Sequence, residues 1–111
     1  MSKVGYKKKT VKVDNRDFMV QVLSFDNGNF ISITEGKEKI GAMVVSIASG
    51  TRATTATVIP SKSDSIFLKM VSEHAASTTN GICIVSLNIQ KELGLETMKV
   101  VMNEIMEIIR Q

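Results

Sequence analysis

Alternation of apolar and polar residues predicts strands throughout the first half of the chain. Residues 8–13 (KKTVKV) alternate strictly, as a strand with one buried face does. Four further segments are rich in β-branched or aromatic residues and too short for convincing helices: 18–25, 30–36, 41–48 and 53–59. Short polar turns separate the early strands, and Asn27-Gly28 is the dipeptide most typical of a two-residue hairpin turn.

The second half changes to a helix, a strand and a helix. Apolar residues recur at helical spacing at Phe67, Met70 and Val71, and His74 continues that spacing. Ser63 or Ser65 is a suitable N-cap for this helix, and Asn80-Gly81 is expected to end it. Residues 82–89 (ICIVSLNI) read as an apolar strand. Residues 95–111 read as a helix with a wide apolar stripe, made by Met98, Val101, Met102, Ile105, Ile108 and Ile109.

This order of elements predicts the fold class. Strands joined by short turns are antiparallel, so we expect an α+β fold. Its single six-stranded sheet would be a mainly antiparallel meander with two helices on one face, in the order βββββαβα. A chain of 111 residues suits one domain covering residues 1–111, and residues 1–6 are expected to form a flexible tail.

Turn positions predict which side chains share a face of the sheet. Closing the first two hairpins at Asn15-Arg16 and Asn27-Gly28 gathers the aliphatic side chains on one face. This face is expected under the helices and collects Val11, Val13, Phe18, Val20, Val22, Ile31, Ile33, Met43, Val45, Ile47, Cys83, Val85 and Leu87.

The opposite face is mixed but too apolar to stand in water, and two helices cover only one face. Small hydroxyl residues between apolar ones suit close packing of one sheet on another. We therefore predict a homodimer or higher oligomer through this face. Its candidate residues are Met19, Gln21, Leu23, Phe25, Phe30, Ser32, Ala42, Val44 and Ser46. The alternatives are a different register or a loop that covers the face.

The charge is uneven along the chain. The net charge is +3, and residues 3–12 (KVGYKKKTVK) hold much of the excess. This basic segment could contact phosphates or an acidic protein, or it could be a charged edge that prevents aggregation. The single Cys83 excludes an intramolecular disulfide and fits a reducing cytosol. No apolar run approaches the ~18 residues that span a bilayer.

Residues 49–61 (SGTRATTATVIPS) raise the question of a phosphate-binding loop. The Gly- and Ser/Thr-rich part, SGTRATT at residues 49–55, lacks the Gly-Lys-Ser/Thr ending of such loops, and no helix opens directly after it. The segment reads better as a short loop at 49–52 and a strand ended by Pro60. Its candidate partner-contact residues are Arg52, Thr51 and Thr54.

Candidate catalytic groups are scarce. His74 has no Cys, His or Asp at metal-ligand spacing, and Cys83 lies in the most apolar strand. We expect no catalytic, cofactor-binding or metal-binding residues and no enzymatic activity.

The layout resembles the proteasome assembly chaperone 3 and 4 family. The resemblance runs through KKTVKVDNRDFMVQVLSF, KIGAMVVSIAS, TTATVIPSKSDSIFLKMVSEHAAS and GICIVSLNI to the last helix, and spans nearly the whole chain. It is a pattern of elements and residue classes without a signature motif.

The resemblance implies a cytoplasmic, non-enzymatic chaperone. Such proteins form dimers whose sheets pack together, and they bind α-type subunits of the 20S proteasome during α-ring assembly. In the family, the link corresponding to the segment between Ile47 and Thr54 is variable and can contact the client; here it is short. Three interpretations compete with this one. The first is a small basic nucleic-acid-binding domain that uses Lys7, Lys8, Lys9, Lys12 and Arg16. The second is a general adaptor or scaffold domain, and the third is an enzyme with an anion-binding loop at residues 49–55.

Overall fold

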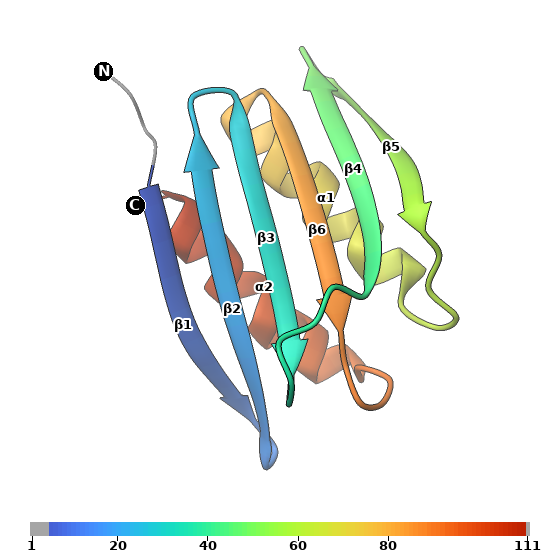
Figure 1. Cartoon of the computed structure of the whole chain (residues 1–111). Coiled ribbons are helices and arrows are strands. Elements are labelled where there is room, and N and C mark those ends of the chain that lie inside the picture. Colours follow the sequence, from blue (N-terminus) through green and yellow to red (C-terminus); the bar gives the residue numbers. More distant parts are fainter. Residues whose placement is uncertain (1–4, 111) are drawn as a thin grey trace.

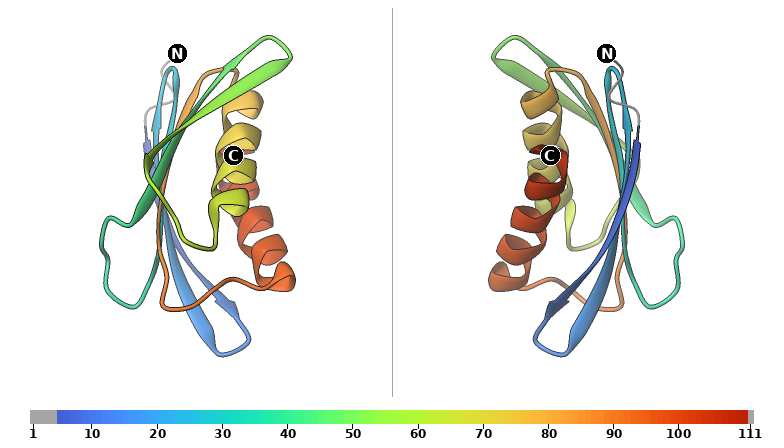
Figure 2. Two further views of the ribbon diagram at one scale, coloured as in Figure 1. Left: turned by 90° about the vertical axis from the view of Figure 1, so that its right-hand side faces the viewer. Right: turned by 90° about the vertical axis from the view of Figure 1, so that its left-hand side faces the viewer.

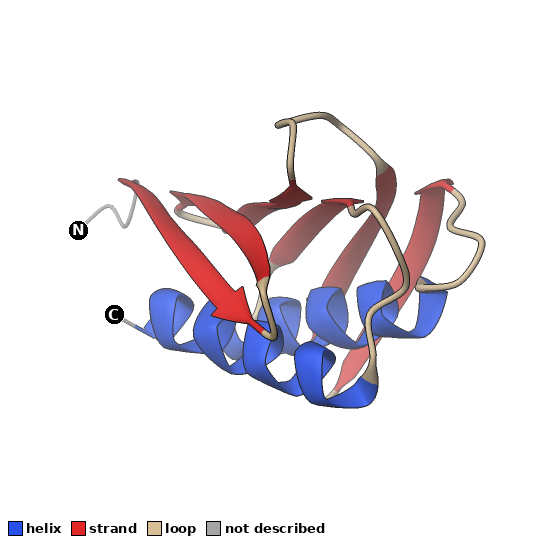
Figure 3. Cartoon of the chain, turned by 90° about the horizontal axis from the view of Figure 1, so that it is seen from below, coloured by secondary structure: helices blue, strands red, loops and turns tan. Residues whose placement is uncertain are grey.

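The computed structural model describes residues 5–110, which form one six-stranded sheet with two helices on one face (Figure 1). Figures 2 and 3 show the two layers, with both helices on the same side of the sheet. The elements are β1 (Gly5–Val13), β2 (Arg16–Phe25), β3 (Gly28–Glu35), β4 (Ala42–Ser49), β5 (Arg52–Ile59), α1 (Ser65–Thr79), β6 (Ile82–Asn88) and α2 (Leu95–Arg110). The predicted α+β class and order of elements are confirmed.

The first two hairpins turn one residue earlier than expected. The first turn is Asp14-Asn15, both with positive φ, and the second is Asp26-Asn27. Val11 consequently pairs with Phe18, and Phe25 pairs with Gly28. Moving a two-residue turn by one position changes the pairing by two residues. Because side chains alternate with period two, the predicted faces of β1, β2 and β3 are unchanged.

The sheet is not a pure meander, and this part of the prediction was wrong. Its strand order is β1-β2-β3-β6-β4-β5, so β6 lies between β3 and β4, parallel to β3 and antiparallel to β4. The strand richest in aliphatic residues therefore occupies an interior position with partners on both sides. Residues 36–41 connect β3 to β4 by passing over the end of β6 (Figure 1).

Three glycines allow the inserted strand to approach its neighbours. A Cβ on Gly28 would lie 1.9 Å from the carbonyl oxygen of Ile82, and one on Gly81 would lie 2.2 Å from that of Asn27. A Cβ on Gly41 would meet the carbonyl oxygen of Leu87 at 2.2 Å. Gly28 thus serves the contact between β3 and β6 and not the hairpin turn to which the sequence pattern assigned it.

The core lies between the sheet and the helices, as predicted, and four of the five strands for which a buried face was predicted turn that face inward; the exception is β4. Phe18, Val20, Ile31, Ile33 and Val85 are fully buried. Helix α1 begins after Asp64, which takes the N-cap position expected for Ser63 or Ser65, and ends at Asn80 in the left-handed conformation as predicted. The inward face of α1 differs from the expected one, since Met70 and His74 are exposed and Leu68 and Ala75 are buried.

Strand β1 begins earlier than predicted. Gly5 and Tyr6 belong to it, so these two residues of the expected flexible tail are strand, and residues 1–4 lie outside the described part of the chain. Neither helix within residues 5–110 is long and apolar enough to span a membrane.

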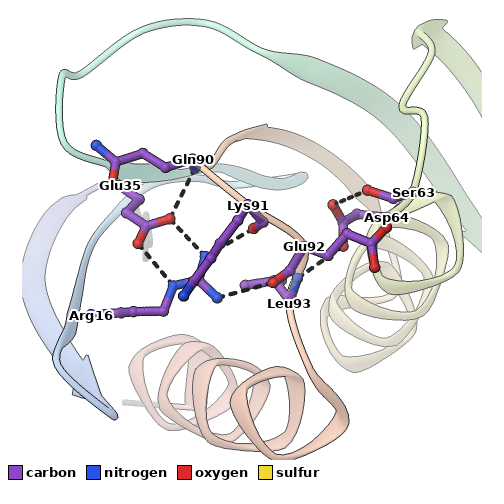
Figure 4. Close-up of polar contacts among 8 residues, drawn as sticks. All are labelled: Arg16, Glu35, Ser63, Asp64, Gln90, Lys91, Glu92 and Leu93. Atoms are coloured by element: carbon purple, nitrogen blue, oxygen red, sulfur yellow. Dashed lines mark hydrogen bonds and ion pairs between the residues drawn. The ribbon is translucent and has the colours of Figure 1, made fainter.

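A buried ion pair joins the sheet to the segment that leads into α2 (Figure 4). Arg16 Nε donates to Glu35 Oε2 at 2.8 Å, and Arg16 Nη2 donates to Glu35 Oε1 at 2.7 Å. The same guanidinium donates to the carbonyl oxygens of Lys91 and Glu92, and Glu35 accepts from the backbone N–H of Gln90. The side chains of Arg16 and Glu35 are only 10% and 8% exposed. The pair therefore fixes the start of α2 relative to β2 and β3.

The bidentate bond from Arg16 holds the pKa of Glu35 below its usual range. Because the folded-state pKa is depressed, the pair stabilises the fold above the ordinary glutamate pKa. That contribution is lost as the pH falls through the depressed value.

Replacing this carboxylate tests the contribution of the pair. Glu35→Gln leaves the Arg16 charge buried without a counter-ion, so we expect urea unfolding at pH 7 to show a loss of about 3 kcal/mol. The exposed control Glu107→Gln should change the free energy of unfolding by less than about 0.5 kcal/mol. On acidification, the free energy of unfolding of Glu35→Gln should also fall less steeply than that of the wild-type protein. Equal acid sensitivity of the two proteins would contradict this role for the pair.

A methyl group at Gly28 tests the close approach of β3 and β6. Because it would collide with the Ile82 backbone, Gly28→Ala should lower the free energy of unfolding by about 3 kcal/mol. Gly94→Ala is the matched control, since a Cβ there meets nothing within 4 Å. Thermal melts of the two variants measure the difference, and indistinguishable melts would rule out the crowding.

Candidate functional site

The face of the sheet away from the helices, here called the open face, carries rows of apolar side chains. Cross-strand pairing sets one row with a residue from every strand: Tyr6, Leu23, Phe30, Ile84, Val45 and Ala56. The adjacent row toward the β2–β3 turn contains Phe25, Gly28, Ile82, Ile47 and Thr54. Leu23 is 40% exposed, Phe25 51% and Ile47 54%. We call Leu23, Phe25, Phe30, Val45, Ile47 and Ile84 the open-face patch.

The residues predicted for this face on β2 and β3 are on it. Met19, Gln21, Leu23, Phe25, Phe30 and Ser32 alternate with the buried residues of these strands and are partly or largely exposed. Whether they contact a second copy stays a prediction.

The predicted orientation of β4 was wrong. Ala42, Val44 and Ser46 were expected on the open face, but Val44 and Ser46 are buried under the helices and Ala42 packs against the core. Their places are taken by Met43, Val45 and Ile47, which had been expected in the core. The open face is therefore more apolar than the sequence suggested.

Small residues on α1 explain this orientation. Helix α1 packs chiefly on β4, and its inward face includes Ser72, Ala75 and Ala76. Ser46 Oγ donates to Ser72 Oγ at 2.7 Å, and Ala48 is buried in the same core. Small side chains on both elements allow the backbones to approach closely, which Met43 and Ile47 would prevent. The run of small residues at 75–77 was the signal in the sequence that could have revealed this.

The other end of the open face is polar and is partly covered by residues 36–41. Figures 2 and 3 show this segment standing off the face opposite the helices. Gln21 Nε2 donates to Glu38 Oε1 at 2.7 Å, and the backbone N–H of Gly41 donates to Ser86 Oγ at 3.1 Å. Thr34 and Ser86 are buried there. The segment leaves Leu23, Phe25 and Ile47 of the open-face patch exposed, and its exposed Ile40 lines a hollow together with Phe30.

The candidate partner-contact residues lie at the β4–β5 hairpin. Gly50 and Thr51 form its turn, with Gly50 at positive φ, and Arg52 begins β5 with an exposed side chain. Thr54 pairs with Ile47 at the border of the open-face patch. The phosphate-loop pattern thus forms a tight hairpin, and contact of these three residues with a partner stays a prediction.

Carboxylates neutralise part of the basic segment. Lys8 Nζ lies 3.8 Å from Glu38 Oε1, and Lys9 Nζ lies 2.8 Å from Glu104 Oε2. Arg16 is held by Glu35, as described above. These pairings reduce the positive charge available to phosphates.

Groups able to do chemistry are dispersed. Burial raises the pKa of the Cys83 thiol to about 12, so it is held as a neutral thiol at neutral pH. His74 is exposed on α1. Across residues 5–110, no three His, Cys, Asp or Glu side chains are grouped to hold a metal ion.

Comparison with known proteins gives a shared fold. No family model matches the sequence, and no curated protein matches it. Ten chains of solved structures match, among them a chain from the crystal structure of a novel chaperone complex for yeast 20S proteasome assembly. That match has a TM-score of 0.63 at 11% identity and covers 96% of this chain and 90% of that chain. The α+β fold described above is therefore the fold of a chain in that chaperone complex.

Two substitutions on neighbouring residues test the orientation of β4. Ser46→Leu adds volume beneath α1 and removes a buried hydroxyl, so we expect it to lower the free energy of unfolding by about 2 kcal/mol. Val45 lies on the open face, so Val45→Leu should change the free energy of unfolding by less than about 0.5 kcal/mol. Chemical denaturation of both variants provides the measurement, and the reverse order of effects would contradict the observed orientation.

Proposed function

We propose that this protein is a non-enzymatic proteasome assembly chaperone that binds α-type subunits of the 20S proteasome and helps α-ring assembly as a dimer. The observation that carries the proposal is the shared fold over 96% of the chain with a chain of the yeast chaperone complex. The sequence resemblance to the proteasome assembly chaperone 3 and 4 family supports it. A chaperone of this kind would act in the cytoplasm.

The open-face patch supports the dimer. Its rows are apolar across four adjacent strands, and both helices cover the other face. Two such faces packed together would remove Leu23, Phe30 and Ile84 from water, as in a β-sandwich. In this proposal, the covering layer is a second copy of the chain.

The hairpin tip would provide contact with the α-type subunit. Arg52 and Thr51 are exposed at the tip, and Thr54 borders the open-face patch. A client bound there would lie next to the dimer interface. Dimer formation would then determine part of the surface that contacts the client.

Nucleic-acid binding is less well supported. The ion pairs of Lys8, Lys9 and Arg16 occupy three of the five basic residues that this function would use. The exposed aromatic side chains Tyr6 and Phe25 are in the apolar rows, away from the polar end of the face.

Affinity purification tests the chaperone function. The tagged chain, expressed in its source cells and recovered at physiological salt, should enrich α-type proteasome subunits by mass spectrometry. A doubly substituted tip, Thr51→Ala with Arg52→Glu, should recover fewer α-type subunits and remain dimeric. Recovery of no α-type subunits by the wild-type chain would contradict the proposed function.

Charge substitution on the open face tests the dimer separately. Leu23→Lys or Ile47→Lys would bury an unpaired charge at the interface, so dimer affinity should fall at least about a hundredfold. Thermal stability measured at low protein concentration should change little, because both side chains are exposed in the protomer. Leu95→Lys, at a 76% exposed position on α2, is the matched control. Analytical ultracentrifugation measures the effect, and an unchanged dimer in both open-face variants would contradict this interface.

A further inference from the structure

The two edges of the sheet differ in charge. Strand β1 carries Lys7, Lys8, Lys9 and Lys12, and charged side chains of this kind discourage an edge from pairing with another strand. Strand β5 is the opposite edge and pairs only with β4 within the described residues. It carries no charged residue between Arg52 and its end at Ile59. Strand β5 lies at the edge of the sheet opposite β1 (Figure 1) and lacks the row of lysines that β1 has.

A groove runs along the seam between β5 and α1. One hollow of about 450 Å³ has Thr57 and Ile59 on the strand side and Ile66 and Lys69 on the helix side. A second hollow of about 550 Å³ continues the seam toward the hairpin tip and is lined by Met70 and His74, among others. Glu73 lines both hollows and so stands at the middle of the groove.

Glu73 is a half-buried carboxylate that forms no ion pair within the described residues, although Lys69, one turn earlier on α1, lines the first hollow with it. Thr55 Oγ1 donates a hydrogen bond to Glu73 Oε2. Thr55 Oγ1 also lies 2.7 Å from Ser46 Oγ, which donates to Ser72 Oγ at 2.7 Å. None of the ion pairs formed within residues 5–110 includes Glu73. The hydroxyl chain fixes the carboxylate in place and leaves its charge to be matched by a bound cation.

Side chains alternate between the two sides of a strand, and this alternation determines which side chains of an added strand would face the groove. Thr55 and Thr57 lie on the helix side of β5, because they pair with the buried residues Ser46 and Val44. A strand added to the β5 edge would direct every second side chain toward the same side. The residue opposite Thr55 would approach Glu73, and a residue two positions away would approach Ile66, which is 72% exposed.

We propose that the β5 edge binds an extended peptide segment of a partner protein, with a basic side chain facing Glu73 and an aliphatic side chain two residues away. Backbone hydrogen bonds to β5 would hold the segment, and the pairing with Glu73 would select its sequence. This surface is on a different edge from the open-face patch, and the proposal does not require the partner to be a proteasome subunit.

A second copy of this chain is a poor occupant of the same edge. On β5 itself, the residues on the helix side are Ala53, Thr55 and Thr57, and none is cationic. Arg52 is on the other side of the strand. Antiparallel pairing of two β5 strands would therefore bring the two Glu73 carboxylates toward each other without a cationic side chain from either strand between them.

Fluorescence anisotropy with a designed peptide tests the proposal. The probe is a fluorescein-labelled nine-residue peptide with arginine at its centre, valine two residues to either side, and threonine or serine elsewhere. Binding to the full chain should weaken about tenfold when the central arginine is replaced by glutamate. Glu73→Gln should weaken binding of the arginine peptide by a similar factor, whereas Glu107→Gln on α2 should leave it unchanged.

Backbone methylation distinguishes strand addition from simple charge attraction. Methylating the amide nitrogens of alternate residues on one edge of the peptide should abolish binding, and methylating the other alternate set should be tolerated. Equal tolerance of both sets would overturn the proposal, as would no binding of the arginine peptide or binding indifferent to Glu73→Gln. Dissociation of a dimer into monomers on addition of the peptide would also overturn the proposal, because it would show that a second copy of the chain occupies the β5 edge.

Discussion

Both helices of this protein lie on one face of the sheet, and the rest of the structure depends on that asymmetry. One face is buried by α1 and α2. Among the described residues, only the segment 36–41 covers part of the other face. That segment exists because β6 enters between β3 and β4, so the chain must cross over the end of β6 to continue. It covers the polar end of the open face and leaves the apolar rows at the other end in contact with solvent. The insertion of β6 thus completes the core and also determines how much of the open face remains available.

Close contact between α1 and β4 makes the open face more apolar. Small side chains on the helix, Ser72, Ala75 and Ala76, require small side chains on the strand, and Ser46 and Ala48 provide them. Alternation then places Met43, Val45 and Ile47 outward. A requirement for packing in the core therefore creates much of the surface that we propose for self-association.

The local features were predictable from the sequence, whereas the long-range features were not. Alternation and helical spacing gave all eight elements, because these periods reflect which side of each element is buried. The faces of β1, β2 and β3 were also predicted correctly, since an error of two residues in pairing preserves the face. The position of β6 and the orientation of β4 depend on contacts between distant segments, and large aliphatic residues on both sides of β4 made its buried side ambiguous. The Arg16–Glu35 pair was missed for the same reason, because its partners are brought together only by the pairing of β2 with β3.

Isotope-filtered NMR on a mixture of labelled and unlabelled protein tests most directly whether the open face is an interface between two copies. We expect intermolecular contacts from the methyl groups of Leu23, Val45 and Ile84, which lie in one row across the sheet. Methyl groups of Val100 and Leu95 on the exposed side of α2 should show none. Intermolecular contacts confined to α2, or a protein that gives none at millimolar concentration, would contradict the proposed dimer.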